Sequence, residues 1–236
     1  ALKGAAPCIG PETVLVSLMN GLGNEDKLLK AAPADRVLYG SGVLGTELPE
    51  PGKCISSPSA DGLQMNFGAV EHGPLADAAG AELERLFNAG GCPCKYWDDV
   101  RPHLWQKIIT NCTFNPLSAI LRLKAKDIMK DMNGAGLAIQ VVTECCAVAT
   151  AKGCPMTASE FMTELRKSVG GGSIEDYYPS MAQDVLMFKR QTEIGTLNGA
   201  ISKYGKALGI PTPANDMITK IISCIQKNYD KQYQED

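Results

Sequence analysis

The sequence has few histidines and aromatic residues, no excess of basic residues and no long apolar run. Only two histidines, His72 and His103, occur among its 236 residues, and aromatic residues make up 6% of it. The 23 lysines and arginines are outnumbered by 26 acidic residues, which is unlike the basic excess of nucleic-acid-binding proteins. No apolar run reaches the roughly 18 residues that span a membrane. We therefore expect neither a nucleic-acid partner nor a membrane span.

The start of the chain, Ala-Leu-Lys-Gly, lacks an initiator methionine and the pattern of a signal peptide. The nine cysteines are irregularly spaced, unlike those of a secreted disulfide scaffold. Cys92 and Cys94 form a close pair, but no second pair or nearby histidine completes a zinc site. We interpret the cysteines as reduced and mostly buried in a cytoplasmic protein, and we expect no metal.

Residues 1–98 alternate short β-type runs with turns and two helical patterns, which predicts part of an α/β sheet. The apolar run 13–19 is typical of a strand buried on both faces, and a turn follows at 20–23. We expect strands at 36–39 and 95–97, a hairpin of 54–56 with 63–67, and helices at 25–32 and 76–89. In the last helix, Leu83, Leu86 and Phe87 should share one side.

After residue 98 the pattern changes to helices alone. Asp98 or Asp99 is placed to cap a helix that runs toward Leu123. Further helices are expected at 134–152, from a capping box at 157–160 to 170, from a second box at 180–183, at about 192–208, and from 212 toward 229. The sequence thus divides into an incomplete α/β part, 1–98, and an all-α part, 99–236.

The glycines at 40, 42 and 45 match the G-x-G-x-x-G pattern of dinucleotide-binding loops and follow a predicted strand. Phosphate binding by this pattern requires a helix to begin at the glycines. Pro49, Pro51 and Gly52 follow instead and disfavour a helix. We therefore interpret residues 40–45 as a turn in a glycine-rich sheet.

Three polar residues, Lys107, Asn111 and Asn115, are spaced four residues apart in the otherwise apolar stretch 104–117. This spacing places them along one face of a helix. Asparagine is a poor helix-interior residue, so two of them lower helix stability without a local benefit. Pro116 should also bend the helix. A solvent-exposed face is the alternative, although such faces usually carry Glu, Lys and Arg.

Five stretches, in this order, resemble the ketopantoate reductase (2-dehydropantoate 2-reductase) family. They are 17–25 (Ser-Leu-Met-Asn-Gly-Leu-Gly-Asn-Glu), 105–117, 179–184 (Pro-Ser-Met-Ala-Gln-Asp), 192–200 and 209–215. The resemblance implies that 1–98 is the C-terminal part of a Rossmann-type NADP-binding domain. It implies that 99–236 is an all-α substrate domain, like the C-terminal domain of 6-phosphogluconate dehydrogenase. It also implies that about 70–80 residues with the phosphate-binding loop precede this sequence, which we expect to be a fragment.

The resemblance implies NADPH-dependent reduction of 2-dehydropantoate (ketopantoate), a small 2-keto acid, to pantoate in pantothenate and coenzyme A biosynthesis. Lys107 matches the catalytic lysine, the general acid toward the carbonyl oxygen. An ammonium suits this role, because hydride attack develops negative charge on that oxygen. Asn111 and Asn115 match asparagines that bind substrate, and Ser180 matches the serine that holds the substrate carboxylate.

Two further matches concern the cofactor. Asn20 matches the asparagine beside the nicotinamide and the substrate, and Glu193 matches the glutamate linked to cofactor and substrate hydroxyls. Each residue also has a structural alternative when taken alone. Asn20 would suit a turn before Gly21, Glu193 a first helical turn, and Ser180 a helix N-cap.

Three positions depart from the family pattern. Ala125 stands where an asparagine is usual, Tyr177 replaces another asparagine, and Gly195 replaces the aspartate after Thr-Glu-Ile. The spacing between Asp184 and Glu193 is one residue longer than usual. Because these departures concern the substrate pocket, two alternatives stay open: a related 2-keto acid or 2-hydroxy acid dehydrogenase with another substrate, and a non-catalytic ligand-binding homologue. A homodimer also stays open.

Overall fold

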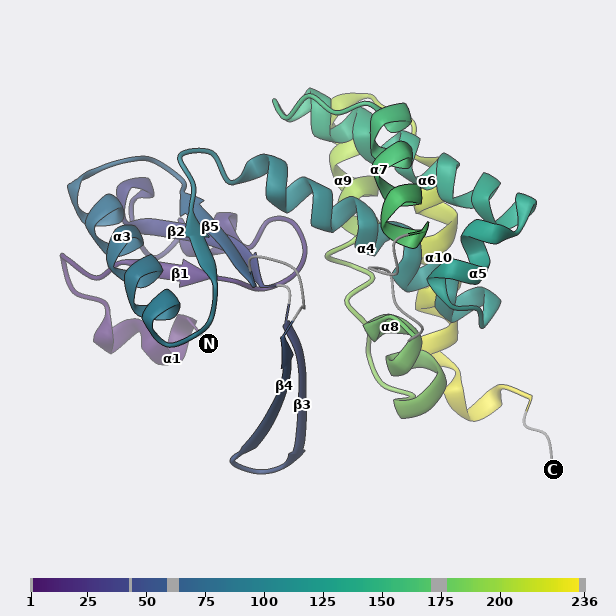
Figure 1. Ribbon diagram of the computed structural model, residues 1–236, viewed down its shortest axis with the longest axis horizontal. Coiled ribbons are helices and arrows are strands. Elements are labelled where there is room, and N and C mark those ends of the chain that lie inside the picture. The colour runs from purple at the N-terminus through teal and green to yellow at the C-terminus, as the bar shows by residue number, and fades with distance from the viewer. Residues whose placement is uncertain (1, 43, 59–63, 171–177, 234–236) are drawn as a thin grey trace. The chain divides into compact units, whose positions relative to one another are not determined.

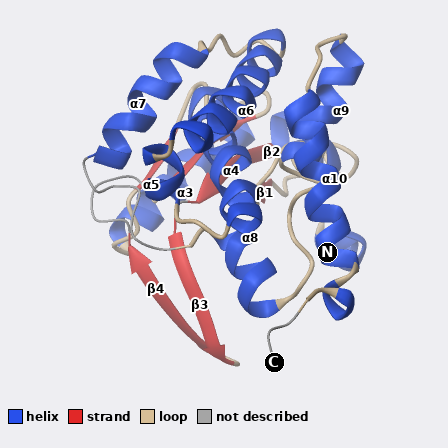
Figure 2. Ribbon diagram, turned by 90° about the vertical axis from the view of Figure 1, so that its right-hand side faces the viewer, coloured by secondary structure: helices blue, strands red, loops and turns tan. Residues whose placement is uncertain are grey.

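The computed structural model describes residues 2–42, 44–58, 64–170 and 178–233. The chain forms two compact units, Ala1–Leu104 and Trp105–Asp236. The first is an α/β unit that carries every strand of the described chain, and the described part of the second consists of helices and loops (Figures 1 and 2).

A four-stranded mixed sheet, in the order β1-β2-β5-β6, forms the centre of the α/β unit. Its strands are β1 (Leu15–Ser17), β2 (Val37–Gly42), β5 (Met65–Ala69) and β6 (Cys94–Tyr96). The pairs β1–β2 and β5–β6 are parallel, whereas β2 and β5 are antiparallel. A separate antiparallel pair is formed by β3 (Leu44–Glu50) and β4 (Lys53–Pro58).

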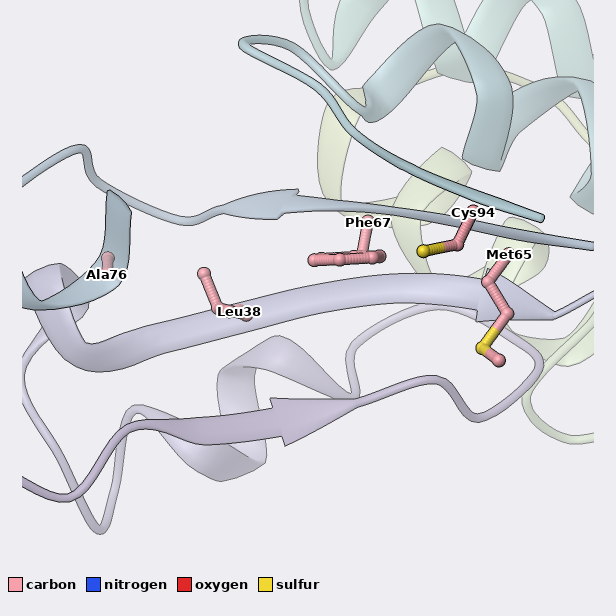
Figure 3. Packing of buried hydrophobic residues seen from close by; sticks show 5 residues of the cluster. All are labelled: Leu38, Met65, Phe67, Ala76 and Cys94. Carbon is pink, nitrogen blue, oxygen red and sulfur yellow. The ribbon is translucent and has the colours of Figure 1, made fainter. Parts of the chain in front are cut away.

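Helices and short turns pack on both faces of this sheet. Neighbouring residues of a strand point to opposite sides, so each face presents apolar side chains that these elements cover. One face carries a buried cluster with helix α3 (Pro74–Ala89), shown in Figure 3: Leu38, Met65, Phe67, Ala76 and Cys94. The other face carries a smaller cluster beside helix α2 (Glu25–Leu28): Leu28, Ala32 and Val37. The remaining short elements of the unit are α1 (Leu2–Ala5), η1 (Ala6–Cys8) and η2 (Ala34–Arg36).

Two predictions about strand environment are wrong. β1 is not buried on both faces, since it lies at the edge of the described sheet and Val16 is 41% exposed. The predicted hairpin of 54–56 with 63–67 does not form, because β4 pairs with β3 and β5 pairs with β2. Phe67 of β5 is 1% exposed, a burial that the central sheet provides and a lone two-stranded ribbon does not.

The three glycines at 40, 42 and 45 lie in strands, so the interpretation as a turn is wrong for them. Gly40 and Gly42 belong to β2, and a strand, β3, follows where a phosphate-binding loop would begin a helix. A Cβ on Gly40 would lie 2.2 Å from the carbonyl oxygen of Asn66, so close strand pairing explains this glycine. Of the three apolar residues predicted to share one side of α3, Leu83 and Phe87 pack against the buried cluster, whereas Leu86 is 50% exposed.

The helical unit is built around α6, which contacts four other helices of the unit, α5, α7, α9 and α10. Its elements are α4 (Arg101–Leu121, which begins in the first unit), α5 (Ala125–Lys130), α6 (Met132–Ala151), α7 (Ala158–Gly170), α8 (Ser180–Gln183), the π-helix η3 (Asp184–Phe188), α9 (Asn198–Leu208), α10 (Pro213–Lys227) and η4 (Tyr229–Lys231). By length and composition α6 alone among the described helices could cross a membrane. Core helices pass the same test, and α6 buries Ala138, Val141, Val142, Cys145 and Cys146.

Local hydrogen bonds account for several predicted helix starts. Asp99 Oδ1 accepts from the backbone nitrogen of Arg101 at 3.0 Å, which confirms an aspartate at the start of α4. The capping box before α7 is also confirmed, since Glu160 N donates to Thr157 Oγ1 at 3.3 Å and the two side chains are hydrogen-bonded. The second box is wrong, because Pro179 is the N-cap of α8 and provides no side-chain hydrogen bond. Helix α5 was not among the predicted helices, and the predicted start of α9 is wrong, because α9 begins at 198 instead of about 192.

Candidate active site

The three residues of the predicted polar stripe all belong to α4, the helix so labelled in Figure 1. Asn115 is buried, at 6% exposure, while Lys107 and Asn111 are partly exposed. Neither side-chain amide has a hydrogen-bond partner among the described residues. Helix α4 continues past Pro116 to Leu121.

Burial dominates the electrostatics of Lys107. Loss of hydration lowers the pKa of its ammonium group from 10.5 to about 8, and the negative charge of Glu193 opposes this shift. The structure thus brings together two residues that the resemblance selected from distant parts of the sequence. A lysine with a pKa close to neutral can hold a proton and also release it.

Glu193 lies in a loop that is anchored to the end of α10. The backbone nitrogen and Oγ1 of Thr192 donate to Gln226 Oε1 at 3.0 and 2.8 Å. Tyr229 donates from its hydroxyl to the carbonyl of Arg190 at 2.9 Å. These bonds explain why α9 begins late, because residues 190–192 are held away from helical geometry.

The segment between Asp184 and Glu193, where the resemblance implies a spacing one residue longer than usual, begins with an unusual helical turn. Asp184–Phe188 forms a π-helix, a rare form of helix that is frequent at functional sites. Lys189 then adopts left-handed geometry, with φ 48°, and Arg190 Nε donates to Asp184 Oδ1 at 2.6 Å.

Ser180 is the first residue of α8 and is exposed. Its hydroxyl makes no hydrogen bond to the rest of the described chain and does not cap the helix, so the N-cap alternative is wrong. Of the departures from the family pattern, Ala125 is buried at the start of α5, at 3% exposure. Gly195 has open space where a Cβ would lie, and Tyr177 lies outside the described residues.

Asn20 belongs to the α/β unit, in the loop that follows the carboxyl end of β1. The alternative that Asn20 is a turn residue before Gly21 agrees with the local geometry, since Gly21 and Gly23 have left-handed φ values of 92° and 77°. The buried side chain of Asn24 organises this loop, because its Nδ2 donates to the carbonyls of Met19 at 3.2 Å, Asn20 at 3.0 Å and Gly21 at 3.3 Å. The role of Asn24 was not predicted from the sequence, where an asparagine four residues after Asn20 was the available signal.

The cysteines are free thiols, and five of the nine are buried: Cys94, Cys112, Cys145, Cys146 and Cys154. Burial and the neighbouring Cys112 thiol raise the pKa of Cys145 well above its ordinary value. A thiol that is held protonated in this way is a poor nucleophile. These residues therefore contribute packing, Cys94 in the α/β unit and the other four in the helical unit.

The lowered pKa of Lys107 predicts a cost in stability. Replacing it with methionine, an apolar residue of similar length, should raise the free energy of unfolding by about 1–3 kcal/mol at pH 7. Between about pH 8 and 10.5 the unfolded chain binds more protons than the folded one, so wild type gains stability as pH rises through this window. Urea unfolding at pH 7 and 10 measures the stability of the variant and the change in wild-type stability with pH. A Lys107→Met protein that is less stable than wild type at pH 7 contradicts the prediction.

The α/β unit has a parallel strand pair with a glycine-containing loop at a carboxyl end, and the helical unit places a lysine close to a glutamate. An α/β unit of this kind followed by a helical unit is an arrangement found in nicotinamide-dependent oxidoreductases. Residues 99–226 match the family described as ketopantoate reductase PanE/ApbA C terminal, and residues 1–71 match ketopantoate reductase PanE/ApbA. The chain belongs to the ketopantoate reductase family.

Individual relatives match most of the chain. The 2-dehydropantoate 2-reductase of Aquifex aeolicus is 30% identical over 225 residues, which cover 94% of this chain and 71% of that protein. D-mandelate dehydrogenase, in its structure with NADH and anilino(oxo)acetate, has a TM-score of 0.85 at 25% identity and covers 98% of this chain and 72% of its own. The PanE/ApbA family ketopantoate reductase of Ralstonia eutropha has a TM-score of 0.79 at 29% identity, with coverages of 97% and 73%. The predicted fold class, a Rossmann-type part followed by an all-α part, is confirmed.

Proposed function

We propose that this protein reduces the keto group of ketopantoate with NADPH, in the pantothenate pathway of the cytoplasm. The observation that carries the proposal is Lys107, partly buried near Glu193 with a pKa of about 8. Residues 1–98 then bind the cofactor and residues 99–236 bind the substrate. Two relatives of this chain, from Aquifex aeolicus and Lactococcus lactis, are 30% and 26% identical to it and are 2-dehydropantoate 2-reductases.

In this proposal Lys107 is the general acid. NADPH supplies a hydride to the carbonyl carbon when it is bound. Lys107 stabilises the negative charge that develops on the carbonyl oxygen and gives it a proton from Nζ. Glu193 keeps the ammonium form of Lys107 populated, because its charge raises the pKa that burial lowers.

The cofactor is proposed to contact Asn20 and Glu193. The geometry of the α/β unit fits this group, since ligands of open α/β sheets bind outside the carboxyl ends of the strands. The loop of Asn20 follows β1 at such an end, and Asn24 fixes its backbone. The NADH in the structure of D-mandelate dehydrogenase is consistent with a nicotinamide cofactor.

The substrate is proposed to be held by Asn111, Asn115 and Ser180. If they bind its hydroxyl and carboxylate groups, Asn115→Ala and Ser180→Ala should each raise KM for ketopantoate. A hydrogen bond to a charged group contributes about 1.5–3 kcal/mol, so the expected increase is about ten- to a hundredfold. Steady-state kinetics at saturating NADPH measures it, and unchanged KM in both variants would leave these residues with packing roles.

The proposal is tested by supplying the full-length protein with ketopantoate and a small panel of other 2-keto acids, with NADPH and with NADH. The decrease in absorbance of the reduced nicotinamide reports turnover. We expect the highest kcat/KM for ketopantoate with NADPH. A higher kcat/KM for another keto acid rejects the assigned substrate, and no turnover with any of them favours a non-catalytic ligand-binding homologue.

A second candidate is a dehydrogenase for a different 2-hydroxy acid. The match to D-mandelate dehydrogenase favours it, as do the alanine at 125 and the glycine at 195 where the family has polar residues. An aromatic 2-keto acid in the same panel separates the two candidates. A homodimer is a further proposal, and sedimentation equilibrium of the full-length protein tests it.

A further inference from the structure

Pro116 leaves one backbone carbonyl of α4 without its usual helical partner. In an α-helix the carbonyl of residue 112 accepts from the backbone nitrogen of residue 116, and proline has no hydrogen there. The side chain of Asn198 replaces this donor, since its Nδ2 donates to the carbonyl oxygen of Cys112 at 2.9 Å. Cys112 and Asn198 are both fully buried, so an unpaired carbonyl here would be costly.

The orientation of Asn198 is fixed by a chain of hydrogen bonds with an acceptor at each end. Glu144 accepts from the backbone nitrogens of Ala214 and Asn215 at 2.8 and 3.0 Å and from Asn215 Nδ2 at 2.7 Å. Asn215 therefore directs Oδ1 toward Asn198 Nδ2, at 2.9 Å. A carboxylate and a carbonyl can only accept, so neither amide can flip without losing hydrogen bonds.

Asn198 is used for its donors alone. Its buried Oδ1 has no hydrogen-bond partner among the described residues, which is a cost that an apolar side chain of the same size would avoid. Such a side chain could not donate to Cys112 or Asn215. The position therefore requires an amide for the sake of these two contacts.

Asn198 also lies next to the loop of Glu193. The carbonyl of Glu193 accepts from the backbone nitrogens of Thr196 and Leu197 at 2.9 and 3.2 Å, which forms a tight turn that leads into α9 at Asn198. A displacement of Asn198 is therefore transmitted to Glu193 through a few backbone hydrogen bonds.

We propose that Asn198 is a positioning residue, which ties α4 at the turn containing Pro116 to the start of α9 and so holds Lys107 in place relative to Glu193. The catalytic use of this geometry rests on the function proposed above. The hydrogen bonds to Cys112 and Asn215 support the geometry itself.

The test compares Asn198→Leu with wild type and with Thr113→Val, a control that removes a different buried side-chain hydrogen bond of α4, from Thr113 Oγ1 to the carbonyl of Ile109 at 2.8 Å. Two quantities are measured in the full-length protein: the steady-state constants, and the pKa of Lys107 from the NMR signal of its ε-carbon. We expect Asn198→Leu to lower kcat at least about tenfold while KM for NADPH stays within about twofold. The pKa of Lys107 should fall, because Glu193 is the charged group that raises it. The control should change none of these.

A second variant keeps the test decisive if Asn198→Leu does not fold. Pro116→Ala restores a backbone donor for Cys112, so the double variant Pro116→Ala/Asn198→Leu is expected to fold. A kcat at least about fivefold below that of Pro116→Ala alone supports the proposal. Equal kcat and equal Lys107 pKa in these two proteins overturn it, as does an unchanged kcat and pKa in Asn198→Leu. The NMR measurement needs no turnover, so an inactive wild type contradicts the proposed function and still leaves Asn198 tested.

Discussion

Replacing Lys107 with alanine is expected to lower kcat for keto-acid reduction by about 10²–10⁴-fold, the usual contribution of a general acid. The variant loses both the positive charge that stabilises the carbonyl oxygen in the transition state and the proton that this oxygen must receive. The pKa of about 8 makes Lys107 suited to release that proton near neutral pH. NADPH affinity, measured by fluorescence titration, should change little, because the proposed role of Lys107 is toward the substrate carbonyl.

Two further variants sharpen this test. Lys107→Arg keeps the charge but should not restore activity, since a guanidinium holds its proton too firmly to donate it. Lys152→Ala is a matched control in the same unit, where the ammonium lies over the ring of Tyr204 at 4.7 Å. A Lys107→Ala protein with nearly full activity on its best substrate would show that the proposed mechanism is wrong.

The rate of reduction is expected to fall above about pH 8 and the rate of the reverse oxidation to rise up to the same pH. Reduction needs the ammonium form of Lys107 as acid, whereas oxidation of the hydroxy acid needs the neutral amine as base. Well above the pKa, kcat for reduction should fall about tenfold for each pH unit, or about a hundredfold at pH 10. Profiles of kcat against pH for both directions measure the fall in reduction and the rise in oxidation. A flat profile from pH 7 to 10 contradicts this role of Lys107.

Glu193→Gln should move the midpoint of both profiles to lower pH. The substitution removes the negative charge that raises the pKa of Lys107 and leaves the burial that lowers it. Glu164→Gln is the matched control, because Glu164 is an exposed carboxylate of α7 paired with Lys167 at 2.6 Å. A midpoint that is the same in Glu193→Gln and wild type would mean that Glu193 does not act on Lys107.

Features with a local cause could be read from the chain. The stripe on α4 follows from a spacing of four residues, and the capping interactions of Asp99 and Thr157 follow from short-range hydrogen bonds. The change from an α/β to an all-helical pattern likewise reflects hydrophobic periodicity within single segments.

Features that depend on distant partners could not be read in this way. β5 pairs with β2 instead of β4, because the central sheet buries Phe67. α9 begins at Asn198 because Gln226 and Tyr229 hold the preceding loop from α10 and the residues that follow it. The organising role of Asn24 was also hidden, since its three acceptors are backbone carbonyls of a loop whose geometry the spacing of residues does not specify.

The sequence by itself determined the class of fold, the helical alignment of Lys107, Asn111 and Asn115, and the family through motifs in a fixed order. Tertiary structure alone decided that Lys107 is partly buried near Glu193 and that Asn198 supplies the hydrogen bond that Pro116 removes from α4. The physical reason is that helix periodicity and capping act over a few residues, whereas desolvation and buried hydrogen bonds arise only when distant segments pack together.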